Sequence, residues 1–150
     1  MTIIKNSRGG LMIDLLVAMG IIALLSTIAI PYIRKYQPNL KLSATARDLT
    51  ADLRYAQQLT VTEQKVYLVN FDAADDQYQI LKIDIATSTI KSVSLDADVS
   101  FKEITGLADN KVVFNFYGGV SLPGQIVLAN INDKTSTINI KPSGYVELAE

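Results

Sequence analysis

The chain has 150 residues, of which 14 are Lys or Arg and 15 are Asp or Glu, so its formal net charge is −1. It contains no Cys and no His, which excludes thiol nucleophiles, Cys/His zinc sites, imidazole bases and the Ser-His-Asp arrangement. This composition argues against a hydrolase or a zinc enzyme. Without disulfides, a domain outside the cytoplasm must be held together by its apolar core.

The first predicted element is an apolar helix near the N-terminus. The nineteen residues from Leu15 to Ile33 carry no charge. As a helix at about 1.5 Å per residue they would span roughly 28 Å, close to the thickness of a hydrocarbon core, so a membrane helix is the first interpretation. A buried core helix rarely stays apolar on all sides over this length, and a cleaved secretory signal usually has a shorter apolar run. Basic residues flank the run on both sides, so the positive-inside rule does not fix its orientation.

An acid, Asp14, stands at the edge of this run. A carboxylate in hydrocarbon costs about 2.5–3.5 kcal/mol on insertion scales, less near the interface, and persists where something pairs with it. No Lys or Arg occurs between Leu15 and Ile33. The nearest cations are Arg8 and a terminal ammonium, which would lie close to Asp14 only if the mature chain began shortly before it.

The segment "SRGGLMIDLLVAMGIIALLSTIAIP" resembles the leader and N-terminal helix of type IV prepilins and type II secretion pseudopilins. In that family a glycine is followed by a short apolar stretch, an acid, a long apolar helix and a proline. The resemblance implies a leader of residues 1–9, cut by a prepilin peptidase between Gly9 and Gly10, with N-methylation of Gly10. Asp14 is then the fifth mature residue and Pro31 the twenty-second, as in the family. Cleavage after Gly10 would displace both by one.

Two residues depart from the family's pattern, because Gly10 stands where Phe is usual and Asp14 where Glu is usual. The resemblance still implies that the Asp14 carboxylate forms an ion pair with the terminal ammonium of a neighbouring subunit. Pro31 is expected to break or bend the helix locally. The expected partners are other pilin or pseudopilin subunits, the prepilin peptidase, the inner-membrane assembly platform and membrane lipid.

The expected location is the inner (cytoplasmic) membrane, crossed once by the segment 10–37, with the N-terminus cytoplasmic and a head of residues 38–150 periplasmic or extracellular.

After Pro38 the sequence predicts an amphipathic helix that continues the apolar one and packs on a sheet. Its apolar residues recur every three or four positions: Leu42, Ala46, Leu49, Leu53, Ala56 and Leu59. Polar residues between them are interpreted as a solvated face: Arg47, Asp48, Asp52, Arg54 and Gln58.

From Lys65 the apolar period changes towards two, which is typical of strands. The predicted strands are KVYLVNF, QYQILKIDI, STIKSVSL, KVVFNFY, GQIVLANI and TSTINIK, and TSTINIKPSGYVEL is predicted to form a closing hairpin. Short connections imply antiparallel pairing. The predicted fold class is α+β, with a long N-terminal helix packed on an antiparallel head. This head resembles GspH/FimT-like minor subunits, which implies two hairpin-rich sheets.

Clustered carboxylates raise the question of calcium in one turn of the head. Asp72, Asp75 and Asp76 are weak candidates, but their spacing is not that of an EF-hand and a plain turn is favoured. The same holds for the polar turn 130–133. Gly118, Gly119 and Gly124 lack the Lys-Ser/Thr that would follow in a phosphate loop.

We predict a minor pilin-like (pseudopilin) structural subunit of a type II secretion pseudopilus or type IV pilus, processed by prepilin peptidase, which is not an enzyme and has no cofactor. One alternative is a competence-type minor pilin whose head binds DNA through Lys111, Lys134 and Lys141. These lysines are scattered, so DNA is not the expected partner. The other alternative is an unprocessed, signal-anchored domain of unrelated function.

Overall fold

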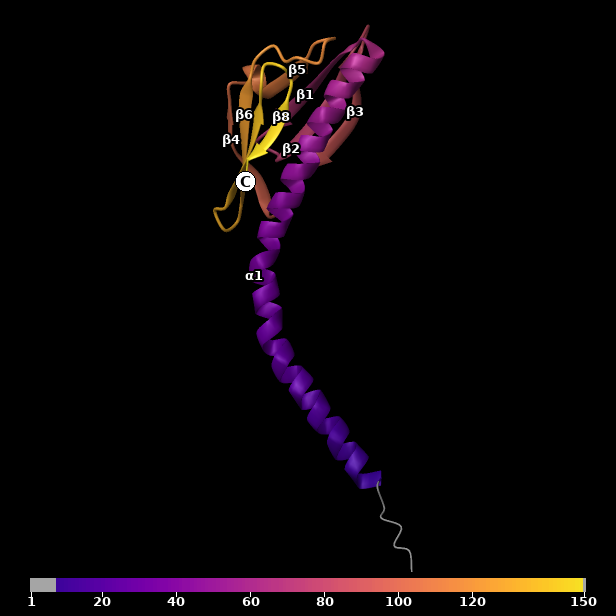
Figure 1. Ribbon diagram of the computed structural model, residues 1–150, viewed down its shortest axis with the longest axis vertical. Coiled ribbons are helices and arrows are strands. Elements are labelled where there is room, and N and C mark those ends of the chain that lie inside the picture. The colour runs from indigo at the N-terminus through magenta and orange to yellow at the C-terminus, as the bar shows by residue number, and fades with distance from the viewer. Residues whose placement is uncertain (1–7, 150) are drawn as a thin grey trace, which may run out of the picture. The chain divides into compact units, whose positions relative to one another are not determined.

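The computed structural model describes residues 8–149, with side chains from Met12 onward, and its contacts divide the chain into two compact units at residues 37 and 38. A single helix, α1 (Arg8–Glu63), runs through both units and is followed by the strands of the second unit (Figure 1). The strands are β1 (Val66–Asp72), β2 (Gln77–Ile83), β3 (Thr87–Ser94), β4 (Val99–Thr105), β5 (Lys111–Phe114), β6 (Gly124–Asn130), β7 (Thr135–Ile140) and β8 (Val146–Ala149), and a 3-10 turn at Ala108–Asn110 precedes β5. We call the second unit the head.

The part of α1 inside the head has the predicted apolar stripe. Ala46, Leu49, Leu53 and Ala56 are fully buried, and Leu59 packs against the core at the helix end. Residues three and four apart share one face of a helix, so this stripe meets the sheets along several turns. Each fully buried leucine contributes roughly 2 kcal/mol of transfer free energy. The predicted amphipathic half of the helix is confirmed.

One residue of the predicted solvated face is buried instead. Asp52 is 8 % exposed and bonds to the Tyr78 hydroxyl and the Lys91 ammonium. It directly precedes Leu53 and lies at the border of the apolar stripe, where the sheet covers it. The prediction of a solvated Asp52 was therefore wrong, because β2 and β3 supply it with partners that local periodicity does not reveal.

The first sheet has the order β3-β2-β1-β5, and all its pairs are antiparallel. Val69 lies opposite Ile80 on one side and Val112 on the other, and all three are buried. Alternate residues of a strand point to one face, so this register places one continuous apolar face inside the head. The outer strand, β3, is exposed along nearly its whole length.

The second sheet has the order β4-β6-β7-β8, again antiparallel throughout. Ile126 and Leu128 of β6 and Ile138 of β7 are fully buried on its inner face. Phe71 of the first sheet meets Phe101 of the second edge to face, with 5.8 Å between ring centroids. Side chains of both sheets and of α1 therefore form one core.

These observations confirm the α+β class, the long helix on an antiparallel head and the two hairpin-rich sheets. Each of the six predicted strands overlaps an observed one, with ends that differ by up to three residues, and β7 and β8 form the closing hairpin. The strand β4 was missed, because its register shifts between Phe101 and Glu103 and breaks the alternation. The run KVVFNFY ends early as a strand, since the Asn115 side chain accepts hydrogen bonds from the backbone amides of Tyr117 and Gly119.

Candidate functional site

The predicted processing site lies at the beginning of α1, which starts at Arg8, so Gly9 and Gly10 belong to its first turn. Residues 1–7 of the predicted leader fall outside the described residues. Cleavage between the two glycines and methylation of Gly10 stay predictions. A glycine offers no side chain that would block a peptidase at the bond.

Asp14 lies on α1 among exposed apolar side chains. Its neighbours Ile13, Leu15 and Leu16 are between 62 % and 71 % exposed. Within residues 12–149, Asp14 has no ion-pair partner. A carboxylate in such surroundings is stable in a membrane only when a cation approaches it from elsewhere.

The helix around Asp14 presents apolar surface on every side. From Met12 to Ile33 the large apolar side chains are all at least half exposed, and this stretch is long and apolar enough to cross a membrane. The hydroxyls of Ser26 and Thr27 donate 2.8 Å hydrogen bonds to the carbonyl oxygens of Ile22 and Ala23. These bonds satisfy both hydroxyls within the helix, so neither needs water.

Gly20 and Pro31 affect how closely this helix can pack and whether it bends. Gly20 has free space around it, since a Cβ there would meet nothing within 4 Å. A residue this small lets another helix approach closely. α1 does not end at Pro31 or at Pro38. A local bend at Pro31 stays a prediction.

A buried polar cluster in the head holds α1 to the first sheet. Asp52 accepts 2.7 Å hydrogen bonds from the Tyr78 hydroxyl and from the Lys91 ammonium. Burial of Tyr78, and next the bond to Asp52, raise the pKa of the Tyr78 hydroxyl well above its usual value, so it remains a donor. The cluster joins three elements, α1, β2 and β3.

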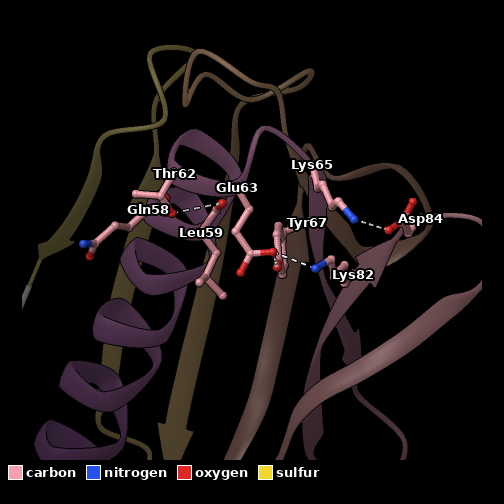
Figure 2. A network of polar contacts seen from close by, with 8 residues as sticks. All are labelled: Gln58, Leu59, Thr62, Glu63, Lys65, Tyr67, Lys82 and Asp84. Atoms are coloured by element: carbon pink, nitrogen blue, oxygen red, sulfur yellow. Dashed lines mark hydrogen bonds and ion pairs between the residues drawn. The ribbon is translucent and has the colours of Figure 1, made fainter.

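A second cluster surrounds the C-terminal end of α1 (Figure 2). Glu63 accepts hydrogen bonds from the Lys82 ammonium at 2.6 Å and the Tyr67 hydroxyl at 2.7 Å, and Lys65 pairs with Asp84 beside it. The bond from Lys82, and next the bond from Tyr67, lower the pKa of the Glu63 carboxyl. Two further ion pairs, from Lys41 to Asp96 and to Asp98 at 2.9 and 2.7 Å, join α1 to the segment between β3 and β4. These clusters fix the helix on the head and hold no reactive arrangement.

The structure places the calcium candidates in a hydrogen-bonded turn. The Asp72 carboxylate accepts from the amide of Ala74 at 3.1 Å, and Asp76 accepts from the amide of Phe101 at 2.9 Å. Among the described residues, no group of three or more His, Cys, Asp or Glu side chains is placed to hold a metal ion. The plain turn favoured by the sequence accounts for these bonds.

The glycine pair of the predicted turn lies against α1. The Gln57 side chain donates a 2.7 Å hydrogen bond to the Gly118 carbonyl, and Gly118 has a φ of 83°. Gly144 approaches the same carbonyl so closely that a Cβ there would lie 1.8 Å from its oxygen. These glycines permit close backbone contacts, and the segment forms a turn rather than a phosphate loop.

The three lysines considered for DNA lie on separate elements. Lys141 pairs with Glu147 at 2.8 Å, and Lys111 lies 3.9 Å from Asp109. Lys134 ends the turn before β7. Two of the three charges are thus offset by nearby acids, which weakens a basic strip.

No protein-family model and no curated protein sequence matches this chain. Solved structures do match it. The minor pseudopilin EpsH from the type 2 secretion system of Vibrio cholerae is 11 % identical, covers 73 % of this chain and 96 % of its own, and has a TM-score of 0.64. The type IV minor pilin FimU of Pseudomonas aeruginosa is 14 % identical, with 80 % and 93 % covered and a TM-score of 0.62.

GspH of E. coli is 17 % identical, with 74 % of this chain and 89 % of GspH covered and a TM-score of 0.57. At such identities the likeness rests on the arrangement of helix and sheets. The chain has the fold of minor pseudopilins and type IV minor pilins, as the resemblance in its sequence implied.

Proposed function

We propose that this protein is a minor, non-enzymatic subunit of a type II secretion pseudopilus or a type IV pilus. The observation that carries the proposal is a single chain in which an apolar helix with one acid, Asp14, continues into a head with the fold of minor pseudopilins. The apolar surface of this helix, exposed in the isolated chain, requires lipid or other helices as a cover.

In this proposal a prepilin peptidase removes residues 1–9 and Gly10 is methylated. The helix then holds the subunit in the inner membrane, with the N-terminus cytoplasmic and the head on the other side. The Asp14 carboxylate pairs with the terminal ammonium of a neighbouring subunit during assembly, at a platform in the same membrane. The pair offsets the cost of a carboxylate in hydrocarbon and sets the register between subunits.

Intact-mass and N-terminal peptide analysis of the full chain tests processing. The protein is isolated from membranes of cells that co-express a prepilin peptidase, with the variant Gly9→Val as control. A chain that begins at Gly10, and an uncut Gly9→Val chain, are expected. A chain that begins at Met1 or Thr2 despite active peptidase would contradict the proposal and favour the signal-anchored alternative.

Incorporation into filaments tests the role of Asp14. Asp14→Ala removes the only acid in the segment, so it is expected to leave membrane insertion intact and to reduce recovery with other subunits after cross-linking. Asp14→Glu keeps the charge and serves as the matched control. Equal recovery of Asp14→Ala and the unaltered protein would remove the pairing mechanism.

A further inference from the structure

The turn between β6 and β7, residues 131–134, is held rigidly by one buried side chain, that of Asn130. Its Oδ1 accepts hydrogen bonds from the amides of Asn132 and Lys134, each 3.0 Å long. Its Nδ2 donates a 2.8 Å bond to Asn39 Oδ1 on α1. The amide of Ile131 donates to the Asp98 carbonyl at 3.2 Å. The turn therefore has a fixed position next to the first residues of α1 in the head.

This position is close, along the chain, to the apolar segment. Asn39 follows Ile33, the last residue of that segment, by six residues, which span at most about 21 Å even when fully extended. The bound follows from chain length alone and holds for any orientation of the head. The headgroup layer on each side of the hydrocarbon core is roughly 5–8 Å thick. A turn bonded to Asn39 is thus within reach of headgroups when the apolar segment is in a bilayer.

The chemistry of the turn suits that location. Ile131 is 66 % exposed although the polar residues Asn, Asp, Gly and Ser are the usual ones in turns. Lys134 is exposed at the other end of the turn and carries a long apolar stem with a terminal cation. Asp133 stands next to Lys134 in the sequence, so residues 131–134 carry no net formal charge and the apolar side chain of Ile131 is the main contact that the turn offers.

We infer that this turn rests on the lipid surface of the bilayer that holds the apolar helix, with Ile131 in the headgroup layer and the Lys134 ammonium beside lipid phosphate. The inference depends on the membrane insertion that the proposed function includes. The contact would hold the head near the membrane before assembly, and the head would leave it when the subunit joins a filament.

Tryptophan fluorescence tests the contact directly, because the chain contains no Trp and each variant therefore has a single tryptophan, which can be excited apart from the seven Tyr. The full-length Ile131→Trp variant is reconstituted in phosphatidylcholine vesicles with or without brominated acyl chains. Quenching by the brominated lipid and a blue-shifted emission are expected. Leu25→Trp, inside the apolar segment, is the control for insertion.

Tyr117→Trp is the matched control in the head. Tyr117 is 96 % exposed in the loop that α1 contacts through Gln57. Gln57 follows Asn39 by eighteen residues, or about 27 Å along the helix. We expect the emission of the Tyr117→Trp variant to be the same in both kinds of vesicle. A second probe, Ile131→Cys labelled with an environment-sensitive dye, covers the case in which the Trp variant fails to fold, since the chain has no other Cys.

The outcomes separate the inference from the proposed function. If the emitter at residue 25 is quenched and the one at 131 is not, the turn does not contact lipid and the inference is wrong, while membrane insertion stands. If residues 131 and 117 are quenched alike, the head adsorbs without preference and the inference is again wrong. If residue 25 is not quenched, the segment is not inserted and the proposed function fails first.

Discussion

The Tyr78 hydroxyl on β2 donates a 2.7 Å hydrogen bond to Asp52 Oδ2 on α1, in a part of the head where both residues are buried. The Lys91 ammonium on β3 reaches the same carboxylate at 2.7 Å, while its own side chain stays about half exposed. Asp52 is thus a buried acceptor for two donors from the sheet. Removing it leaves a buried hydroxyl without a partner, whereas removing Lys91 leaves a carboxylate that still has Tyr78.

Asp52→Ala is expected to destabilise the head by about 1–3 kcal/mol, because the buried Tyr78 hydroxyl loses its acceptor. Lys91→Met is the matched control and is expected to cost less, since the Asp52 carboxylate keeps its bond from Tyr78 and the Lys91 side chain is about half exposed. Urea unfolding of the full-length variants in detergent measures both. Equal losses would mean that the ion pair, rather than the hydroxyl bond, holds the helix to the sheet.

Gly144→Ala is expected to destabilise the head by at least about 2 kcal/mol, through backbone strain at a φ of 79° and a Cβ that would lie 1.8 Å from the Gly118 oxygen. The contacting atom belongs to the backbone, so no side chain can turn away. Gly20→Ala is the control, because a Cβ there meets nothing within 4 Å. Thermal unfolding of both variants distinguishes them, and a tolerated Gly144→Ala would show that the two turns separate easily.

Acid should weaken the junction between α1 and the first sheet. The Lys82 ammonium, and next the Tyr67 hydroxyl, hold the folded-state pKa of Glu63 below its ordinary value of 4.5, and the Lys41 ammonium likewise lowers the pKa of Asp96 below its ordinary 3.8. A lowered folded pKa contributes stability that is present above the unfolded value and is lost as pH falls through the folded one. We expect the unfolding temperature to fall as pH drops below about 4.5.

Glu63→Gln isolates the contribution of one carboxyl to this pH dependence. Its unfolding temperature should change less than that of the unaltered chain below pH 4.5, the ordinary pKa of a Glu side chain. Measurement at high salt serves as a control, since screening should weaken these exposed pairs in both proteins. Parallel pH profiles for the two proteins would assign the acid sensitivity to other groups.

The sequence predicted those features of the fold that depend on local periodicity. The apolar stripe from Leu42 to Leu59 and six of the strands follow from spacings of three, four and two, and the structure has them. The strand β4 was not predicted, because a bulge interrupts its alternation. The burial of Asp52 was not predicted either, because its partners are 26 and 39 residues away in the sequence. Tertiary pairing of this kind leaves no local signal.

The functional residues also differ in how far the sequence alone reveals them. Asp14 and the apolar run around it are visible from composition alone, because an acid beside uncharged residues is rare in membrane helices. Asn130, by contrast, looked like one more turn residue. Its bond to Asn39, 91 residues away, gives the turn its fixed place on α1. Only the folded head brings these two residues together.

The bond between Asn39 and Asn130 can be measured through a double-mutant cycle. Asn130→Ala removes the Nδ2 donor and the acceptor that organises the turn, and is expected to cost about 1–3 kcal/mol, since Asn130 is 5 % exposed. Asn39→Ala removes only the shared bond and should cost less. Residues in direct contact typically couple by about 0.5–3 kcal/mol, so the double variant should lose less than the two single losses added together. Urea unfolding of the four full-length proteins provides the cycle. Fully additive losses would mean that the turn keeps its position without α1, and Ile131 would then not be fixed beside the start of the head.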